Sequence, residues 1–209
     1  MNLNERKHQA KRNSKEAILK AARKVFSEKG FNRATVEEIT SKAELSPGTL
    51  YLYFKSKEEL YTFLSIAVLK RFSVENQKIA DCAIPVEEKM ERYCDIFMDV
   101  YDHDPTILIN LFHLQSGEAL HYLSDEATQQ LKKYSALAYG SMVATIKEGI
   151  ESGVYINEYP MALADILWGA YAGVVLWVNS KRLLNDQKNF VKSTLEIAFK
   201  IILQGMKTN

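Results

Sequence analysis

Apolar residues near the start of the chain recur at the spacing of an amphipathic α-helix. In residues 14–29 they fall at i, i+3, i+4, i+7 and i+8, at Ile18, Ala21, Ala22, Val25 and Phe26. Side chains at this spacing share one face of a helix. Gly30 follows and supplies a stop signal. The pattern predicts a first helix from Ser14 to Lys29.

The residues that follow predict a short second helix. Thr35 and Glu38 have the spacing of a capping box, in which the threonine oxygen accepts from a backbone N–H and the glutamate reaches back to the cap. We expect this helix to run from Val36 to about Ala43. Its expected buried residues are Val36, Ile39 and Ala43.

A third and a fourth helix are predicted in the same way. Ser46 suits the N-cap and Pro47 the first helical position, where no N–H is needed, so a helix is expected to about Phe54. Ser56 and Glu59 repeat the capping-box spacing and open the next helix. Only about three residues separate the second helix from the third. Two short helices joined by a tight turn and covered by a longer one form a helix-turn-helix unit.

The third helix carries the chemistry expected of a DNA-reading element. In such units the second helix of the pair enters the major groove by its N-terminal end. Gly48 allows a close backbone approach, Thr49 offers a hydroxyl and a methyl group, and tyrosine or lysine side chains can reach phosphates. Either Tyr51 or Tyr53 could instead be half-buried against the first helix. Leu50 and Phe54 are assigned to the core, and the predicted DNA-binding residues are Thr35, Ser46, Pro47, Gly48, Thr49, Tyr51, Tyr53 and Lys57.

Charge is divided unevenly along the chain. Residues 1–57 hold 13 Lys+Arg and 6 Asp+Glu, a net +7, while the remaining residues hold 14 and 20, a net −6. A basic N-terminal part on an acidic body indicates that the small part meets a polyanion. A solvated basic helix face is the alternative interpretation.

Composition places the chain among ordinary cytoplasmic proteins. It has 209 residues, of which 47% are hydrophobic and 25% charged. The cysteines, Cys82 and Cys94, have no pairing or metal-ligand spacing, so we expect reduced thiols. No apolar signal-peptide segment follows the basic N-terminus, and no charge-free apolar run reaches about 18 residues. We therefore expect no membrane association.

The region from Ile18 to Leu60 resembles the N-terminal domain of the tetracycline-repressor (TetR) family of bacterial transcriptional regulators. Glu44 stands where that family often has glycine in the turn, and Thr40 where it often has alanine. These two departures bear on the geometry of the turn and on the base preference. The resemblance implies a larger C-terminal helical domain that binds a small effector and dimerises. The matching anchors are Ala22, Phe26, Gly30, Thr35, Ile39, Ala43, Ser46, Gly48, Thr49, Tyr51, Tyr53, Phe54, Lys57 and Leu60.

Beyond Leu60 the pattern stays helical, and its last two helices are the predicted dimer interface. Thirteen residues, 166–178, carry no charge; the run is too short to span a bilayer and is expected to be a helix contacted on several sides. Gly169 and Gly173, four residues apart, would allow another helix to come close. Pairing of the last two helices with their twofold mates is also common in the family. The predicted interface residues are Gly169, Gly173, Val191, Leu195, Ala198 and Ile202.

Aromatic residues at helical spacing are the candidates for an effector pocket, which should be mainly apolar with a few polar groups. Such a stripe can equally be plain core. No cofactor is expected, and no metal site, because adjacent residues such as those in Asp102 to Pro105 do not converge easily on one ion. The candidate pocket residues are Tyr93, Phe97, Tyr101, Phe112, His113, Tyr139, Trp168 and Tyr171.

The sequence therefore predicts an all-α protein with a three-helix DNA-binding domain in residues 1–57 and an effector-binding and dimerisation domain in residues 58–209. We interpret it as a homodimeric regulator of palindromic DNA sites, most simply a repressor released by a small apolar or aromatic effector. A helical regulator or interaction protein without an effector is the alternative. An enzyme is disfavoured, because the chain lacks a glycine-rich phosphate loop, a nucleophile elbow and an obvious acid–base pair.

Overall fold

A computed structural model describes residues 3–103, 123–184 and 190–208 of the chain. In these ranges the regular elements are α-helices, and Tyr155 and Lys207 form one isolated β-bridge. The all-α prediction is confirmed. The helices are α1 (Leu3–Arg33), α2 (Val36–Lys42), α3 (Pro47–Tyr51), α4 (Lys57–Asp81), α5 (Val86–His103), α7 (Asp125–Glu151), α8 (Pro160–Leu184) and α9 (Val191–Gly205).

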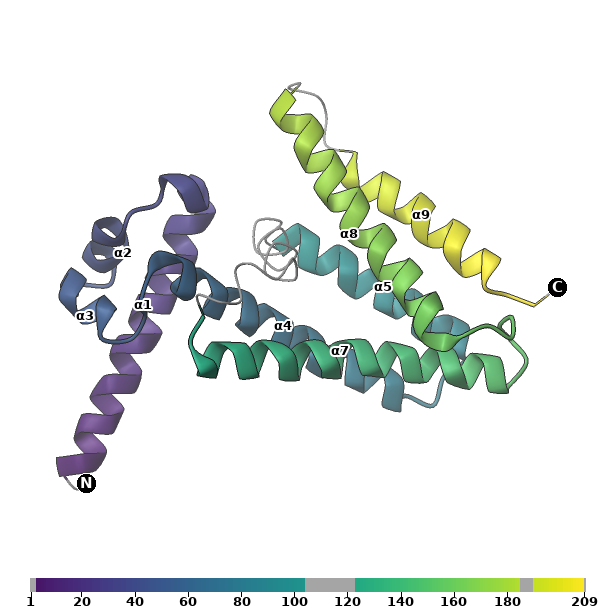
Figure 1. Ribbon diagram of the computed structural model, residues 1–209, viewed down its shortest axis with the longest axis horizontal. Coiled ribbons are helices and arrows are strands. Elements are labelled where there is room, and N and C mark those ends of the chain that lie inside the picture. Colours follow the sequence, from purple (N-terminus) through teal and green to yellow (C-terminus); the bar gives the residue numbers. More distant parts are fainter. Residues whose placement is uncertain (1–2, 104–122, 185–189, 209) are drawn as a thin grey trace.

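The helices form a small head and a larger body, as Figure 1 shows. Helices α1, α2 and α3 gather at one end of the molecule, and α4 leads from them into the body. There α4 lies along α7, α5 packs against α4, α7 and α9, and α8 packs against α7 and α9. This arrangement matches the predicted helix-turn-helix unit followed by a larger helical part.

Helix α1 starts eleven residues earlier than predicted, at Leu3 instead of Ser14. The added part holds two Lys and two Arg together with one each of Leu, Glu, Gln and Ala, all good helix formers, but it has no apolar stripe. Its first buried core residue is Ile18, so the preceding turns extend away from the head (Figure 1). Gly30 adopts a left-handed φ of 75° and interrupts the helical geometry where the stop was predicted.

The predicted caps of α2 and α3 are present. Thr35 and Glu38 form the reciprocal capping box, with Ile39 buried and Val36 and Ala43 only partly so. Ser46 caps α3, but this helix ends at Tyr51 and not near Phe54. At the start of α4 only half of the predicted box forms.

That half-box has a simple cause. Ser56 Oγ accepts from the Glu59 backbone N–H at 3.2 Å. The Glu59 carboxylate, however, accepts from the N–H of Lys55 at 2.6 Å instead of returning to Ser56. The glutamate is 3% exposed, and this hydrogen bond satisfies it in the interior of the head.

The turn between α2 and α3 requires a left-handed residue, and that residue is Glu44, with φ 57°. The Leu45 N–H donates to Thr40 O at 2.9 Å and the Ala43 N–H to Ile39 O at 3.0 Å, so this residue lies at the reversal of the chain. A left-handed backbone strains residues with a Cβ atom. The position is the one where the resembling family often has glycine.

Helix α4 belongs to both parts of the molecule. Its Tyr61 ring lies 4.8 Å from the rings of Phe26 and Phe31, and its Phe63 ring lies 5.4 Å from that of Phe54. Further along, the same helix packs against α7. The predicted domain boundary at residue 57 falls at its first residue, whereas the first two turns of α4 complete the core of the head.

The prediction that residues 166–178 are covered on several sides is not met within one chain. Helix α8 buries Leu167, Tyr171 and Val175, but Ile166 is 55% exposed and Trp177 is 63% exposed. By length and composition alone, Pro160–Val178 could cross a membrane, and only 33% of it is buried. Its contacts with α7 and α9 place its other side in the helical body.

The predicted interface stripe on α9 points inward for half its members. Val191 and Leu195 are fully buried within the subunit, so they pack in its own core and are not available to a partner. Ala198 and Ile202 are partly buried. The outer face of α9 instead carries Ile197 and Ile201, which are 61% and 66% exposed.

Candidate nucleic-acid interface and effector cavity

The start of α3 is an exposed, internally organised tip. Ser46 Oγ accepts from the Thr49 N–H at 3.2 Å and lies 2.9 Å from Thr49 Oγ1. Ser46, Pro47 and Gly48 are exposed, while Leu50 one turn later is fully buried. A Cβ atom on Gly48 would meet only Ser46 Oγ, at 3.8 Å, so nothing inside the head demands glycine there. The small residue leaves backbone open on the outer side.

The two tyrosines that follow differ in exposure. Tyr51 is 55% exposed, whereas Tyr53 is half-buried against the core of the head, which fits the alternative interpretation of that residue. Leu52, beside Tyr51, is 78% exposed, although no spacing pattern in the sequence marks it as functional. An exposed leucine next to the tip can contact an apolar group such as a thymine methyl.

Lys57, predicted to contact phosphate, makes hydrogen bonds within the head. Its Nζ donates to the carbonyl oxygens of Phe31 and Ala34, each at 3.0 Å, and lies 4.5 Å from the Phe31 ring centroid. Two of its three N–H donors are therefore used within the protein. The residue holds the start of α4 to the end of α1, a role that spacing alone does not reveal.

Thr35 likewise has a structural partner. Its Oγ1 accepts from the Glu38 N–H at 3.2 Å, and the Glu38 carboxylate accepts from the Thr35 N–H at 3.2 Å. A hydrogen bond from Lys29, together with the one from Thr35, lowers the pKa of Glu38 below its usual value. The threonine hydroxyl keeps its own proton for a further acceptor.

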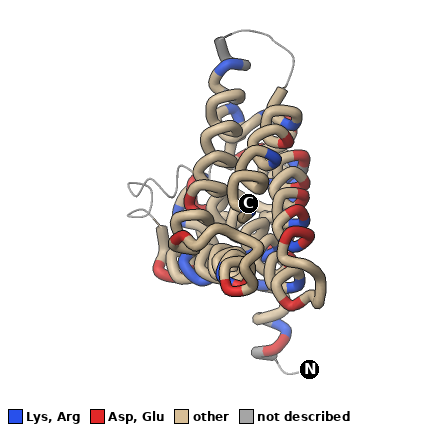
Figure 2. The backbone as a smooth tube through the Cα atoms, turned by 90° about the vertical axis from the view of Figure 1, so that its right-hand side faces the viewer, with Lys and Arg blue, Asp and Glu red and all other residues tan. Residues whose placement is uncertain are grey.

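Charge on the folded protein follows the division seen in the sequence. Arg6, Lys11 and Arg12 are exposed along the first turns of α1. Asp and Glu are frequent along the body helices, as Figure 2 shows from the end of the body. An ion pair links the two parts, since Lys15 Nζ on α1 lies 3.7 Å from Glu126 at the start of α7; the same Nζ lies 4.4 Å from the Phe63 ring centroid.

A cavity of about 370 Å³ lies in the body among α4, α5, α7 and α8. Three of the predicted effector residues line it, namely Phe97, Tyr139 and Trp168. Tyr139 OH donates toward Asp165 and Met161 O, and desolvation with the nearby Asp165 raises the pKa of Tyr139. The prediction missed the other wall residues, which are Leu69, Phe72, Asn76, Ser135, Ala136, Ala138 and Met142.

Tyr93, Tyr101 and Tyr171 are buried and do not line this cavity. Tyr93 OH lies 3.2 Å from Asn76 O and 3.1 Å from Thr145 Oγ1, and desolvation raises the pKa of Tyr93 to about 12. Tyr171 OH donates to Phe97 O at 2.8 Å. Tyr93 and Tyr171 thus join helices in the core, which is the alternative interpretation of the aromatic stripe. The predicted residues Phe112 and His113 lie outside the described residues.

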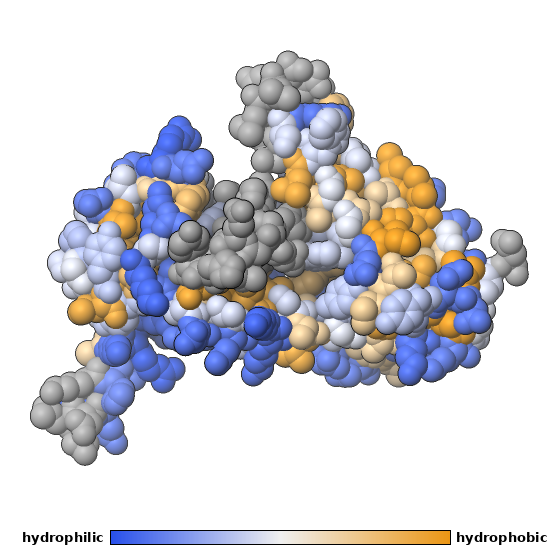
Figure 3. Space-filling view, viewed as in Figure 1, coloured by the Kyte–Doolittle hydropathy of each residue, from blue (hydrophilic) through white to orange (hydrophobic). Residues whose placement is uncertain are grey.

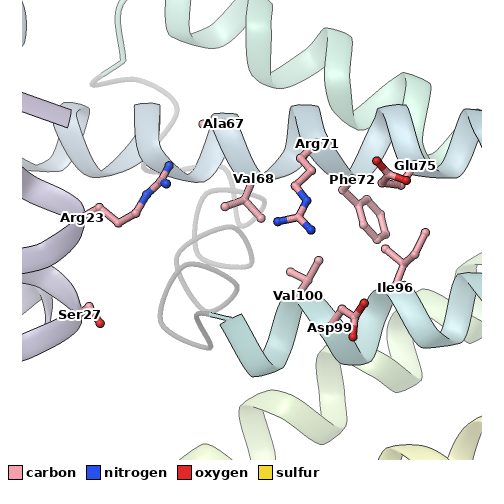
Figure 4. A pocket seen from close by; sticks show the side chains of 10 residues that line it. All are labelled: Arg23, Ser27, Ala67, Val68, Arg71, Phe72, Glu75, Ile96, Asp99 and Val100. Carbon is pink, nitrogen blue, oxygen red and sulfur yellow. The ribbon is translucent and has the colours of Figure 1, made fainter. Parts of the chain in front are cut away.

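A second cavity, of about 380 Å³, lies between the head and the body. Figure 4 shows Arg23 reaching from α1 and Arg71 from α4, with Asp99 on α5 near Val100. Both arginines are exposed, and Glu75 also lines the space. This cavity is therefore a mixed-charge crevice, in contrast to the mainly apolar one inside the body.

Comparison with known proteins agrees with this geometry. Residues 18–62 match the sequence model of the family described as bacterial regulatory proteins, tetR family. The chain is 28% identical over 170 residues to the HTH-type transcriptional repressor NicS of Pseudomonas putida, covering 81% of this chain and 77% of that one.

Solved structures of low sequence identity share the fold. A regulator of the TetR/AcrR family from Thermobifida fusca superposes with a TM-score of 0.73 at 18% identity, over 93% of this chain and 98% of that one. FadR from Bacillus subtilis, solved in complex with stearoyl-CoA, gives 0.66 at 20% identity, over 91% and 98% of the two chains.

The fold and the helix-turn-helix unit define a transcriptional regulator, not an enzyme. Its N-terminal domain, over residues 18–62, is that of the tetR family of bacterial regulatory proteins.

Proposed function

We propose that the protein is a cytoplasmic homodimeric repressor that binds a palindromic DNA site and is released from it by a small, mainly apolar effector. The observation that carries the proposal is the exposed tip of α3, where Ser46, Gly48 and Thr49 are held by the cap. The basic head supports it, since polyanion binding is driven by such charge.

In the proposed complex the α3 tip enters the major groove. Thr49 and Tyr51 are its sequence-reading side chains, and Ser46, Pro47, Gly48 and Tyr53 fix how closely the tip approaches. Lys57 has one N–H donor left for a phosphate, and Thr35 has its hydroxyl proton. Phosphate contacts of this kind set the position of the head, while base contacts set its selectivity.

The outer faces of α8 and α9 form the proposed dimer surface. On α8 the exposed residues Ile166, Gly169, Gly173 and Trp177 follow one helical stripe, with the two glycines at its centre. Helix α9 packs beside α8 and adds exposed isoleucines, and Figure 3 shows apolar surface over this region. Covering such a stripe with its twofold copy removes large apolar side chains from water.

Helix α4 is the proposed connection between effector and DNA. Its residues Leu69, Phe72 and Asn76 line the cavity in the body, while Tyr61 and Phe63 on the same helix contact the head. A ligand that fits the cavity best after α4 has shifted would change the spacing of the two heads in a dimer. The affinity for DNA would then fall by a factor set by how much more tightly the ligand binds the shifted state than the DNA-binding state.

DNA binding is tested by gel shift with the DNA that flanks the protein's own gene, with unrelated DNA as competitor. We expect selective binding that weakens strongly with salt. Thr49→Ala and Tyr51→Ala should each weaken selective binding by about 1–3 kcal/mol, because they remove contacts to bases or to positioning phosphates. Tyr159→Ala, which truncates a tyrosine 66% exposed on the body, is the matched control.

Two results would separate the proposal from its alternatives. Unselective binding at every salt concentration, or Thr49 and Tyr51 variants that select DNA as the unaltered protein does, would contradict the reading role of α3. Selective binding that no apolar small molecule relieves would instead favour a regulator without an effector.

A further inference from the structure

One polar atom in the wall of the body cavity has no hydrogen-bond partner among the residues that the structure describes. Asn76 lies on α4, lines the cavity and is 1% exposed. Its Nδ2 donates to the carbonyl oxygen of Ala138 on α7 at 3.0 Å. Its Oδ1 is buried and has no hydrogen-bond partner among the described residues.

The orientation of this amide is set by its neighbour. A carbonyl oxygen can only accept, so the side of the Asn76 amide that faces Ala138 O must be the NH₂ group. Turning the amide over would bring two acceptors together and leave the NH₂ group without the acceptor that it has in Ala138 O. The unpartnered group is therefore an acceptor, and the described part of the chain supplies no donor for it.

A buried acceptor without a donor is costly, by about 1–3 kcal/mol. Proteins normally satisfy such groups, and exceptions tend to be found where a ligand or a water completes the site. A lone water is held well only by two or more polar partners. Apart from Asn76, Ser135 and Tyr139, the residues that line the cavity are apolar, so a ligand can both fill the apolar space and supply the donor.

The described wall of the cavity also limits the charge of the ligand. None of its ten residues carries a formal charge at neutral pH. A carboxylate or phosphate placed here would lose its hydration without a cation in return, and it would face Asn76 Oδ1 as a second acceptor. The enclosed part of the ligand is therefore neutral.

We propose that the effector belongs to the class of neutral, mainly apolar molecules, ring-sized or larger, that carry a hydroxyl or N–H group donated to Asn76 Oδ1. The inference rests on the proposed effector role of this cavity and specifies the chemical class of the effector. A plain alkyl chain would fill the same space yet leave Oδ1 unpaired. Asn76 is thus the specificity-determining residue of the cavity, and its position on α4 couples that hydrogen bond to the helix that reaches the head.

The test uses two pairs of probes that are alike in shape but differ in the donor, indole with benzofuran and 2-naphthol with 2-fluoronaphthalene. Affinities are measured by calorimetry on the full-length protein. We expect the donor-bearing member of at least one pair to bind about tenfold more tightly or better, which corresponds to about 1.4 kcal/mol. In Asn76→Leu, similar in size but without polar atoms, that preference should disappear.

Ser135→Ala is the matched control, because it alters the wall of the same cavity and leaves Asn76 intact, so the preference should persist. Should Asn76→Leu fail to fold, a crystal structure of the unaltered protein with indole decides. An indole nitrogen about 3 Å from Asn76 Oδ1 supports the inference, and a water there, or indole bound elsewhere, overturns it.

The inference is also overturned if neither pair shows a preference, if no donor-bearing probe binds, or if the preference survives in Asn76→Leu. A gel shift on the same preparations tells whether only the inference about the effector has failed or the proposed DNA-binding function as well. Protein that still selects its DNA remains a regulator, with another class of effector.

Discussion

At the scale of single residues, Glu44 adopts a backbone conformation that is unfavourable for a residue with a Cβ atom. It holds a left-handed φ of 57° at the turn of the helix-turn-helix unit, where glycine would carry no Cβ strain. Its carboxylate also places a negative charge close to the element that we propose to approach DNA. Both features concern the same residue, and they can be separated by substitution.

We predict that Glu44→Gly raises the free energy of unfolding by up to about 1 kcal/mol, because glycine releases the left-handed strain while losing some of that gain to chain entropy. Glu44→Ala removes the charge but keeps the Cβ atom, and it should leave stability nearly unchanged. Denaturant unfolding of the three proteins provides the measurement. Equal stabilisation by both substitutions would assign the effect to charge and not to backbone strain.

Residues with local partners were predictable from the sequence. The caps at Thr35 and Ser46 depend on atoms three residues away, and the structure contains both. Lys57 and Asn76 could not be interpreted in this way, because their partners lie 26 and 62 residues distant in the chain. Tyr93 and Tyr171 were expected in the pocket because spacing identifies a buried face but not which buried residues border empty space.

At the scale of whole elements, the first turns of α1 are the main difference between expectation and structure. A helix with no apolar stripe gives no periodic signal, although its residues have high intrinsic propensity. The stripe of α9 was detected correctly, yet one apolar face can pack inside the subunit or outside it. Burial then showed that Val191 and Leu195 face inward and Ile197 and Ile201 outward.

We predict that replacing Arg6, Lys11 and Arg12 together by glutamine weakens DNA binding and lowers the magnitude of its salt slope by up to about 3, since each lost phosphate contact removes about 0.9. Thermal stability should stay the same, because the core begins only at Ile18. Anisotropy titrations at several salt concentrations check the slope. An unchanged slope would mean that these turns do not lie along the duplex.

At the scale of the whole molecule, the apolar stripes of α8 and α9 are the surface that a single chain leaves uncovered. We predict that Trp177→Asp shifts the protein toward monomer and weakens dimerisation by at least about thirtyfold, since loss of a tryptophan that is an interface hot spot typically costs about 2 kcal/mol or more. Analytical ultracentrifugation measures this shift. Selective DNA binding should weaken with it.

Val74→Asp, which places the same charge on an apolar residue 46% exposed on α4, is the control and should remain dimeric. A Trp177→Asp protein that sediments like the unaltered one would remove this face from consideration.

The sharing of α4 between head and body also determines where the molecule can be divided. Tyr61 and Phe63, in the first turns of α4, complete the core of the head. Later turns of the same helix line the body cavity. A chimaera that takes its head from a relative must therefore also take the first turns of α4 from that relative, with the junction after residue 63. The helical register must be kept across the junction. A junction at the loop before α4 would expose Phe26, Phe31 and Phe54 to mismatched partners and give an insoluble hybrid.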